Sequence, residues 1–210
     1  MNQILIWYWM TLYRNINLHR SLIFLLVAMV ACPVSCDRPA PMVLIRTDLG
    51  DMTVEIYPDR APVTAGNFLA HVERGTYTNS VFYRVVRLDN QPDSPVKIEV
   101  IQGGLFSDEL LDTIAPIIHE STRQTGILHT DGVISMARNQ PGSASTEFFI
   151  CIGDQPSLDF GGLRNPDGQG FAAFGKVVRG MDVARAIQAL PDEGQYLKEQ
   201  VRIREISLLP

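Results

Sequence analysis

The chain has 210 residues, of which 46% are hydrophobic and 20% charged, so it can bury the core of a globular domain. Arg14 and Arg20 are the only charged residues before residue 37, so 16 of the 18 basic residues and all 23 acidic residues follow, with a net charge of -7. This acidic balance argues against binding of nucleic acid through its phosphates.

Residues 1–36 have the pattern of an export signal. Arg14 and Arg20 precede an apolar run, 22–31, that is too short to cross a bilayer as a helix. Small residues then lead to Cys32, as in a lipoprotein processing box, and Cys36 is a second candidate for lipid attachment. We therefore expect an exported protein with possible membrane attachment through an N-terminal lipid. A plain cleaved signal and an uncleaved anchor stay as alternatives.

Residues 37–41 are expected to form a linker, and 42–210 a single domain. The only cysteine after residue 36 is Cys151, which leaves no partner for a disulfide within this domain. Because it lies in an apolar strand-like run, we interpret it as a buried hydrophobic residue rather than a nucleophile. No pair of cysteines or histidines has the spacing of metal ligands, so we expect neither a metal nor a cofactor.

Short β-prone runs dominate the rest of the chain. Runs at 42–47 and 52–57 flank an Asp/Gly turn and predict a hairpin. Pro62 can open a helix that Gly75 ends, and a second helix is expected near Asp182, which can cap it. Further strands are expected at 81–87, 96–101, 132–137, 147–152, 171–178 and 201–208. Many short strands with two helices are typical of a mainly β fold, here a closed antiparallel barrel.

Six motifs carry a resemblance to a known family. They are APVTAGNF at 61–68, FYRVV at 82–86, IQGG at 101–104, GVISMAR at 132–138, FFI at 148–150 and FGKV at 174–177. Their order along residues 42–210, roughly, resembles that of the cyclophilin-type peptidyl-prolyl cis–trans isomerases. Within this family, the chain resembles the exported bacterial members. The resemblance implies a closed eight-stranded antiparallel barrel with two capping helices and a shallow groove on its outside. It also implies a monomer that acts on Xaa–Pro bonds of folding polypeptides, in the periplasm or on a membrane facing it.

The resemblance also implies the site. The catalytic positions are Arg84, Gln102 and Phe149, with Phe149 as the floor of a proline pocket. The positions expected to line the groove and bind substrate are Ala137, Arg138, Glu147, Leu158 and Phe171. The partners would be proline-containing polypeptides.

Strand periodicity gives independent support for part of this site. Successive side chains of a strand point to opposite faces, so Glu147 and Phe149 share one face and Phe148 takes the other. In a barrel one face is the core and the other lies outside. We therefore expect Phe148 in the core and Phe149 in the groove.

The chain departs from the family at several points. Arg84 and Gln102 are 18 residues apart, whereas the family separates them by fewer than about ten, so the extra segment 88–97 should protrude beside the groove. Glu99 and Val100 stand where the family has an apolar pair of the pocket wall, unless the insertion shifts the local register and brings other residues there. Glu147 replaces the usual glutamine. These departures leave two alternatives open, a module that binds proline peptides without catalysis and an envelope scaffold.

Overall fold

The computed structural model describes residues 39–210, and the predicted export signal and the first two residues of the predicted linker, 37 and 38, lie outside this part. The described chain is mainly β. Its strands are β1 (Met42–Thr47), β2 (Gly50–Ile56), β3 (Ser80–Val86), β4 (Val100–Gly104), β5 (Val133–Met136), β6 (Phe148–Cys151), β7 (Ala172–Arg179), β8 (Asp192–Glu193) and β9 (Tyr196–Leu208). Its helices are α2 (Pro62–Glu73), α3 (Asp108–Leu111), α4 (Thr122–Thr125), α5 (Met181–Gln188) and the 3-10 turn η1 (Pro156–Leu158).

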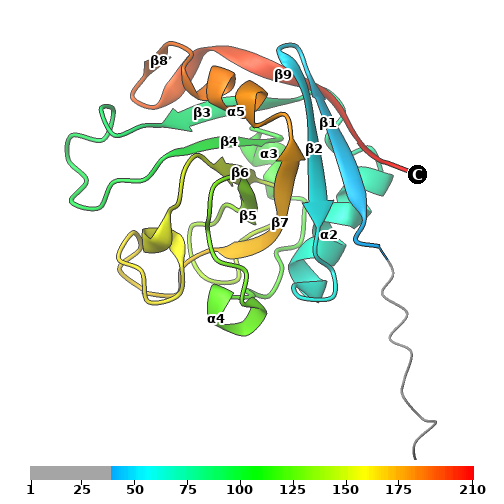
Figure 1. Ribbon diagram of the computed structural model, residues 1–210, viewed down its shortest axis with the longest axis horizontal. Coiled ribbons are helices and arrows are strands. Elements are labelled where there is room, and N and C mark those ends of the chain that lie inside the picture. The colour runs from blue at the N-terminus through cyan, green and yellow to red at the C-terminus, as the bar shows by residue number, and fades with distance from the viewer. Residues whose placement is uncertain (1–38) are drawn as a thin grey trace, which may run out of the picture. The chain divides into compact units, whose positions relative to one another are not determined.

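Eight of these strands close into an antiparallel barrel. The ring runs β1-β2-β7-β5-β6-β4-β3-β9 and is closed by pairing of β1 with β9. The two-residue strand β8 adds to β9 beside the ring. Closure removes the open edges that an isolated sheet would present for aggregation. The predicted eight-stranded barrel is thus confirmed (Figure 1).

The two longer helices cover the barrel. In Figure 1, α5 lies near the top of the barrel and α2 near the lower ends of β1 and β2. Phe68 of α2 and Ile187 of α5 are fully buried and belong to the same apolar core as the inward-facing strand residues. The centre of that core is aromatic, because Phe68 packs 4.9 Å from Phe174 and edge-on to Phe148 at 5.8 Å between ring centroids. The one-turn helices α3 and α4 were not predicted.

The segment before β4 differs from the prediction. A strand was expected from residue 96, but β4 begins at Val100. The buried side chain of Gln91 bonds the backbone of Ile98 from both amide atoms, with its Nε2 2.8 Å from the carbonyl oxygen and its Oε1 3.3 Å from the nitrogen. The side-chain amide of Gln91 therefore makes the backbone hydrogen bonds to Ile98 that a neighbouring strand would otherwise make.

The C-terminal elements also differ in detail. Asp182 does not cap α5, because the helix begins directly after Gly180, whose backbone has a positive φ of 89°. A Cβ at Gly180 would lie 2.3 Å from the carbonyl oxygen of Asp51, so the close approach of β2 requires glycine here. Strand β9 begins five residues before Val201, because its polar first part pairs with β8 and β3.

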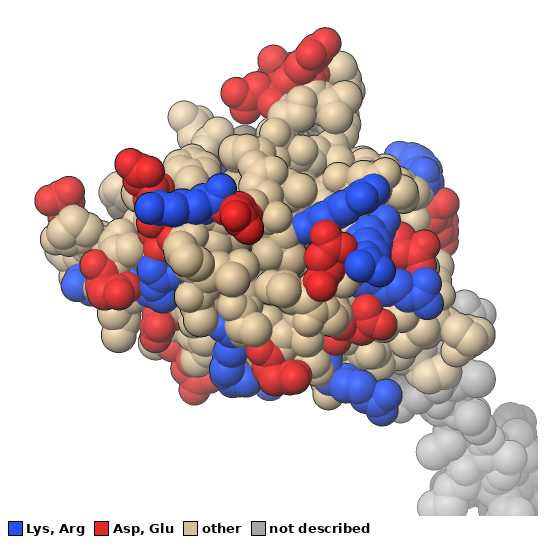
Figure 2. All heavy atoms as spheres, turned by 90° about the horizontal axis from the view of Figure 1, so that it is seen from above, with Lys and Arg blue, Asp and Glu red and all other residues tan. Residues whose placement is uncertain are grey.

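Charged side chains of both signs are interspersed over the face in Figure 2, which carries no continuous basic stripe. Several charged side chains of the described residues pair, such as Arg46 with Glu205 and Arg204 with Asp48, at 2.6 and 2.7 Å. Exposed pairs of this kind add little to stability. Within residues 39–210, no helix is long and apolar enough to span a membrane.

Candidate active site

Arg84 reaches the outside of the barrel because β3 is irregular. The pairing register of β3 shifts between Phe82 and Arg84, against both β4 and β9. Such a bulge re-aims side chains, so Phe82 stays in the core while the consecutive Tyr83 and Arg84 both line an external groove. The strand register places Gln102 of β4 directly beside Arg84.

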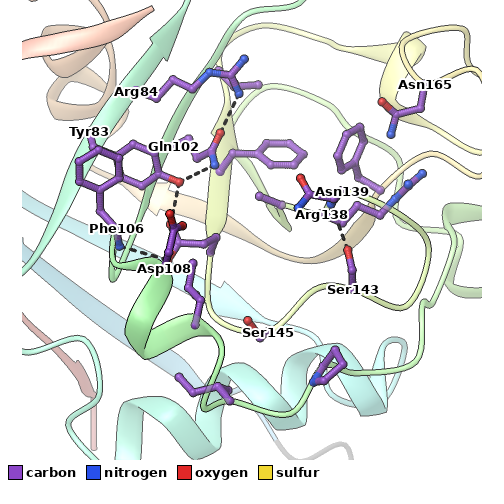
Figure 3. A pocket seen from close by; sticks show the side chains of 18 of the residues that line it. Tyr83, Arg84, Gln102, Phe106, Asp108, Arg138, Asn139, Ser143, Ser145 and Asn165 are labelled. Carbon is purple, nitrogen blue, oxygen red and sulfur yellow. Dashed lines mark hydrogen bonds between the residues drawn. The ribbon is translucent and has the colours of Figure 1, made fainter.

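Amide oxygens hold the guanidinium of Arg84. Its Nη1 donates to Oε1 of Gln102 at 2.9 Å (Figure 3). Its Nη2 and Nε donate to Oε1 of Gln195 at 2.5 and 3.1 Å. Burial lowers the pKa of Arg84, but guanidinium remains protonated in proteins. Three of its five N–H groups are used, so two can donate to a ligand in the groove.

An apolar hollow lies beside this guanidinium. Phe149 is 4% exposed and forms a second apolar cluster outside the barrel, whereas Phe148 is in the core. The ring of Phe171 meets Phe149 edge-on at 5.3 Å between centroids. The other members of this cluster are Val86, Ile98, Val100, Ala137, Cys151 and Leu158.

His129 supports the floor of the hollow from behind. Its ring stacks on Phe149 at 5.9 Å, and its two nitrogens lie 2.7 Å from Oδ1 of Asp159 and 3.0 Å from Oγ of Ser135. His129 is 1% exposed, so it fixes the floor and has no access to a ligand. Cys151 is fully buried, and burial raises the pKa of its thiol well above the ordinary value.

The eight residues expected from the sequence line one groove. Its volume is about 1180 Å³, and its walls include Arg84, Gln102, Phe149, Ala137, Arg138, Glu147, Leu158 and Phe171. The structure thus brings all of them together, although they come from β3, β4, β6 and the segments after β5 and β6.

Arg138 contributes to the groove as part of its wall. Its guanidinium donates to both carboxylate oxygens of Asp167, at 2.8 and 3.0 Å, and to the carbonyl oxygen of Gly170. It lies over the ring of Phe171, 5.1 Å from the centroid. The side chain is 1% exposed, so its bonds are directed to the protein and it holds Phe171 in place.

Comparison with known proteins identifies the family. Residues 42–208 match the family model described as cyclophilin type peptidyl-prolyl cis-trans isomerase/CLD. The chain belongs to this family. It is 32% identical over 171 residues to a peptidyl-prolyl cis-trans isomerase of Acinetobacter baylyi, covering 80% of this chain and 82% of the relative. It is 36% identical over 152 residues to peptidyl-prolyl cis-trans isomerase B of Escherichia coli, covering 71% and 85%.

Solved structures show the same fold. A cyclophilin-type isomerase of Cryptosporidium parvum superposes with a TM-score of 0.63 over 81% of this chain and 98% of that one, at 21% identity. A second structure of that protein was solved in the presence of the dipeptide Ala-Pro. The function expected from the sequence is supported, and the chain is a peptidyl-prolyl cis–trans isomerase of the cyclophilin family.

The pocket wall of this cyclophilin departs from the family's apolar pair. Of the two alternatives that the sequence left open, the structure has the shifted register, because Ile98 and Val100 line the groove and Glu99 does not. Side chains alternate along an extended segment, so 98, 100 and 102 share one side and Glu99 takes the other. The carboxylate of Glu99 therefore does not lie in the apolar wall of the groove.

The segment 88–97 extends outward between β3 and β4 (Figure 1). Arg164, from the loop before β7, anchors it. Its Nη1 donates to Oε1 of Gln91 at 3.0 Å, to Oγ of Ser94 at 2.6 Å and to the carbonyl oxygen of Val96 at 2.6 Å. Arg164 also lines the groove, so the extra segment is tied to the groove's rim.

We expect Arg164→Ala to release this segment. Three hydrogen bonds to a charged donor are lost at once, and such bonds contribute about 1.5–3 kcal/mol each at most. Amide hydrogen exchange in residues 91–97 should then become at least about tenfold faster. Arg202→Ala, on the exposed side of β9, is the control and should leave that exchange unchanged. Unchanged exchange in Arg164→Ala would show that the segment is held by other contacts.

Several residues of the site were missing from the sequence-based prediction, among them Tyr83, Phe106 and Arg164, which line the groove, and Gln195, which bonds Arg84. Tyr83 reaches the groove only because of the bulge in β3. Gln195 lies 111 residues from Arg84, in a turn where its φ is 76°. No local pattern in the sequence indicates either position.

Proposed function

We propose that Arg84 accelerates rotation about the Xaa–Pro bond by donating a hydrogen bond to the prolyl nitrogen of the twisted amide. Partial double-bond character gives the peptide bond a rotational barrier of about 18–20 kcal/mol. The two isomers of an Xaa–Pro bond differ by only about 0.5–1 kcal/mol, but they exchange in tens to hundreds of seconds. A catalyst must therefore bind the twisted amide more tightly than either flat form.

The reaction needs a hydrogen-bond donor for the prolyl nitrogen and a pocket that holds the proline ring. When the amide twists, resonance is lost and the prolyl nitrogen gains a lone pair that accepts a hydrogen bond. Arg84 offers two unused N–H groups at the edge of the apolar hollow, and this juxtaposition is the observation that carries the proposal. Because no proton is transferred, the reaction needs no acid, base or metal.

Magnitudes show that the guanidinium does not act alone. A charge-assisted hydrogen bond contributes about 1.5–3 kcal/mol. A rate gain on the order of 10⁵ requires roughly 7 kcal/mol. The remainder comes from holding the proline ring in the hollow of Phe149, Leu158 and Phe171 while the preceding carbonyl swings. Gln102, beside Arg84, can bind the backbone of the residue that swings.

The shape of the groove indicates the class of substrate. The groove is open and lies outside the barrel, so it can accept a proline within an extended chain. The Cryptosporidium relative studied with Ala-Pro supports a proline-containing peptide as ligand. We therefore assign unfolded and folding polypeptides as the substrate class.

A module that captures proline segments without catalysis is the competing function. The additional segment 88–97 beside the groove is the feature that favours it. A protease-coupled assay with an Ala-Pro peptide separates the two, since only the trans isomer is cleaved. Acceleration at substoichiometric protein supports the enzyme. Peptide binding with no acceleration supports the module and contradicts the proposed role of Arg84.

We propose further that the protein is exported to the periplasm and attached to a membrane by lipid on Cys32 or Cys36. The basic residues before the apolar run 22–31, and the small residues after it, support this proposal. Cells fed labelled fatty acid should yield labelled protein. One of the two substitutions, Cys32→Ser or Cys36→Ser, should abolish the label, and that cysteine carries the lipid. An unlabelled wild-type protein in the periplasmic fraction would instead indicate a plain cleaved signal.

A further inference from the structure

A line of hydrogen bonds crosses the groove from Glu147 to Arg84. The Tyr83 hydroxyl donates to Oε2 of Glu147 at 2.6 Å, and Nε2 of Gln102 donates to the Tyr83 oxygen at 2.6 Å. Oε1 of Gln102 then accepts from Nη1 of Arg84 at 2.9 Å. Figure 3 shows Tyr83, Gln102 and Arg84 in this succession.

The two ends of this line impose the same direction on every bond. An ionised carboxylate only accepts hydrogen bonds, and a guanidinium only donates them. The Tyr83 proton must therefore point to Glu147, which leaves the Tyr83 oxygen to accept from Gln102. The amide of Gln102 is then held with its oxygen toward Arg84.

Backbone N–H groups hold the carboxylate of Glu147 in place. Its Oε1 accepts from the backbone nitrogens of Leu105 at 2.7 Å and of Phe106 at 3.5 Å. Gly104 makes room for it, because a Cβ there would lie 2.2 Å from Oε1. The ring of Phe106 stacks on Tyr83 at 4.2 Å between centroids and 21° between planes. The carboxylate therefore cannot turn away from Tyr83 without losing these bonds.

We propose that Glu147 is a positioning residue for the isomerase, which sets the amide of Gln102 through Tyr83 and thereby fixes the guanidinium of Arg84. This role rests on the function proposed above for Arg84. It differs from the direct contact with substrate that the family resemblance implied for Glu147. Both of its oxygens bond to donors of the protein.

The isosteric variant Glu147→Gln is expected to reverse the line. Its amide oxygen would stay on the two backbone N–H groups, so its NH₂ group would face the Tyr83 oxygen. The Tyr83 proton would then turn to Gln102, whose amide must flip and present NH₂ to Arg84. Two donors would face each other, and kcat/KM should fall about tenfold, which corresponds to about 1.4 kcal/mol.

A pH profile gives an independent readout. Burial raises the pKa of Glu147, and protonation, like Glu147→Gln, lets the group donate toward Tyr83. Activity should therefore fall as the pH is lowered through this raised pKa. The variant should lack this acid limb. Tyr83 keeps its proton throughout, because burial raises its pKa as well.

Other ionisable groups must be separated from Glu147. Around it, β3 contributes Tyr83 and Arg84, and α3 with the residue after it contributes Asp108 and Asp112. Arg138, Arg164 and the buried His129 lie further along the groove and behind its floor. Because all of these groups are present in both proteins, only the difference between wild type and Glu147→Gln reports on Glu147.

Folding can be checked in the same samples. A buried carboxyl with a raised pKa stabilises the fold while protonated and loses that contribution as the pH rises through its folded pKa. The uncharged Glu147→Gln should therefore unfold at neutral pH at the same or a higher temperature than wild type. A loss of activity at unchanged stability then reflects positioning. If the variant fails to fold, Tyr83→Phe takes its place in this comparison, because it cuts the same line of hydrogen bonds and should also lack the acid limb.

The test is a double-mutant cycle of Glu147→Gln and Tyr83→Phe, with Glu99→Gln as the matched control outside the groove. We expect Glu147→Gln to lower kcat/KM about tenfold in wild type but to have no further effect in Tyr83→Phe, and Glu99→Gln to have none. An equal loss in both backgrounds, or an active wild type that tolerates Glu147→Gln, would overturn the role of Glu147 alone. An inactive wild type would overturn the proposed function together with this role.

Discussion

Replacing Arg84 with alanine is expected to lower kcat/KM for an Ala-Pro peptide by about 10- to 150-fold. This range is the loss of one charge-assisted hydrogen bond, about 1.5–3 kcal/mol, made in the twisted state alone. Because the flat peptide makes no such bond to its nitrogen, the loss should appear in kcat rather than in KM. A protease-coupled assay over a range of peptide concentrations measures both constants.

Arg84→Lys is the informative partner of this variant. Lysine keeps the positive charge but lacks the planar fork that bonds Gln102 and Gln195 at once. We expect its activity to lie much closer to that of alanine than to that of arginine. Activity near the wild-type level in Arg84→Lys would show that charge alone suffices and that the orientation of the guanidinium is unimportant.

Phe149→Ala is expected to produce a loss of similar size by another route. Phe149 forms the floor of the hollow, and burial of an apolar side chain the size of a proline ring contributes about 1.5–3 kcal/mol. The flat peptide also uses this hollow, so the loss should raise KM by about tenfold or more. Because a ring that is no longer held can turn with the carbonyl, kcat should fall as well.

Phe149→Ala is also expected to destabilise the fold. Phe149 is 4% exposed, and truncation of a buried phenylalanine costs about 3–5 kcal/mol of stability, so its assay belongs well below its melting temperature. Phe149→Leu keeps most of the apolar volume and should retain most of the binding. A normal KM in folded Phe149→Ala would place the proline elsewhere in the groove.

The sequence predicted the parts of this protein that depend on local pattern. The alternation of Phe148 and Phe149 predicted that one is core and the other groove, and the structure confirms the two faces. The motifs in order predicted the barrel and eight residues that share one groove.

The sequence could not predict what depends on irregular backbone or on distant partners. The bulge in β3 turns Tyr83 to the groove, against the alternation of an ideal strand. Gln91 replaces a strand partner at Ile98 through a single side chain, and Gln195 approaches Arg84 only after β8 and β9 have folded back. These contacts come from tertiary closure, which leaves no periodic pattern in the sequence.

In the proposed mechanism, the guanidinium of Arg84 favours the twisted amide over the flat one. Exchange spectroscopy of an Ala-Pro peptide measures this most directly, because cis–trans exchange and the bound fraction are read from one sample. With wild type and Arg84→Ala compared at equal bound fraction, exchange should be at least about tenfold faster in wild type. Equal exchange rates at equal occupancy would contradict it, since the groove would then act through binding alone.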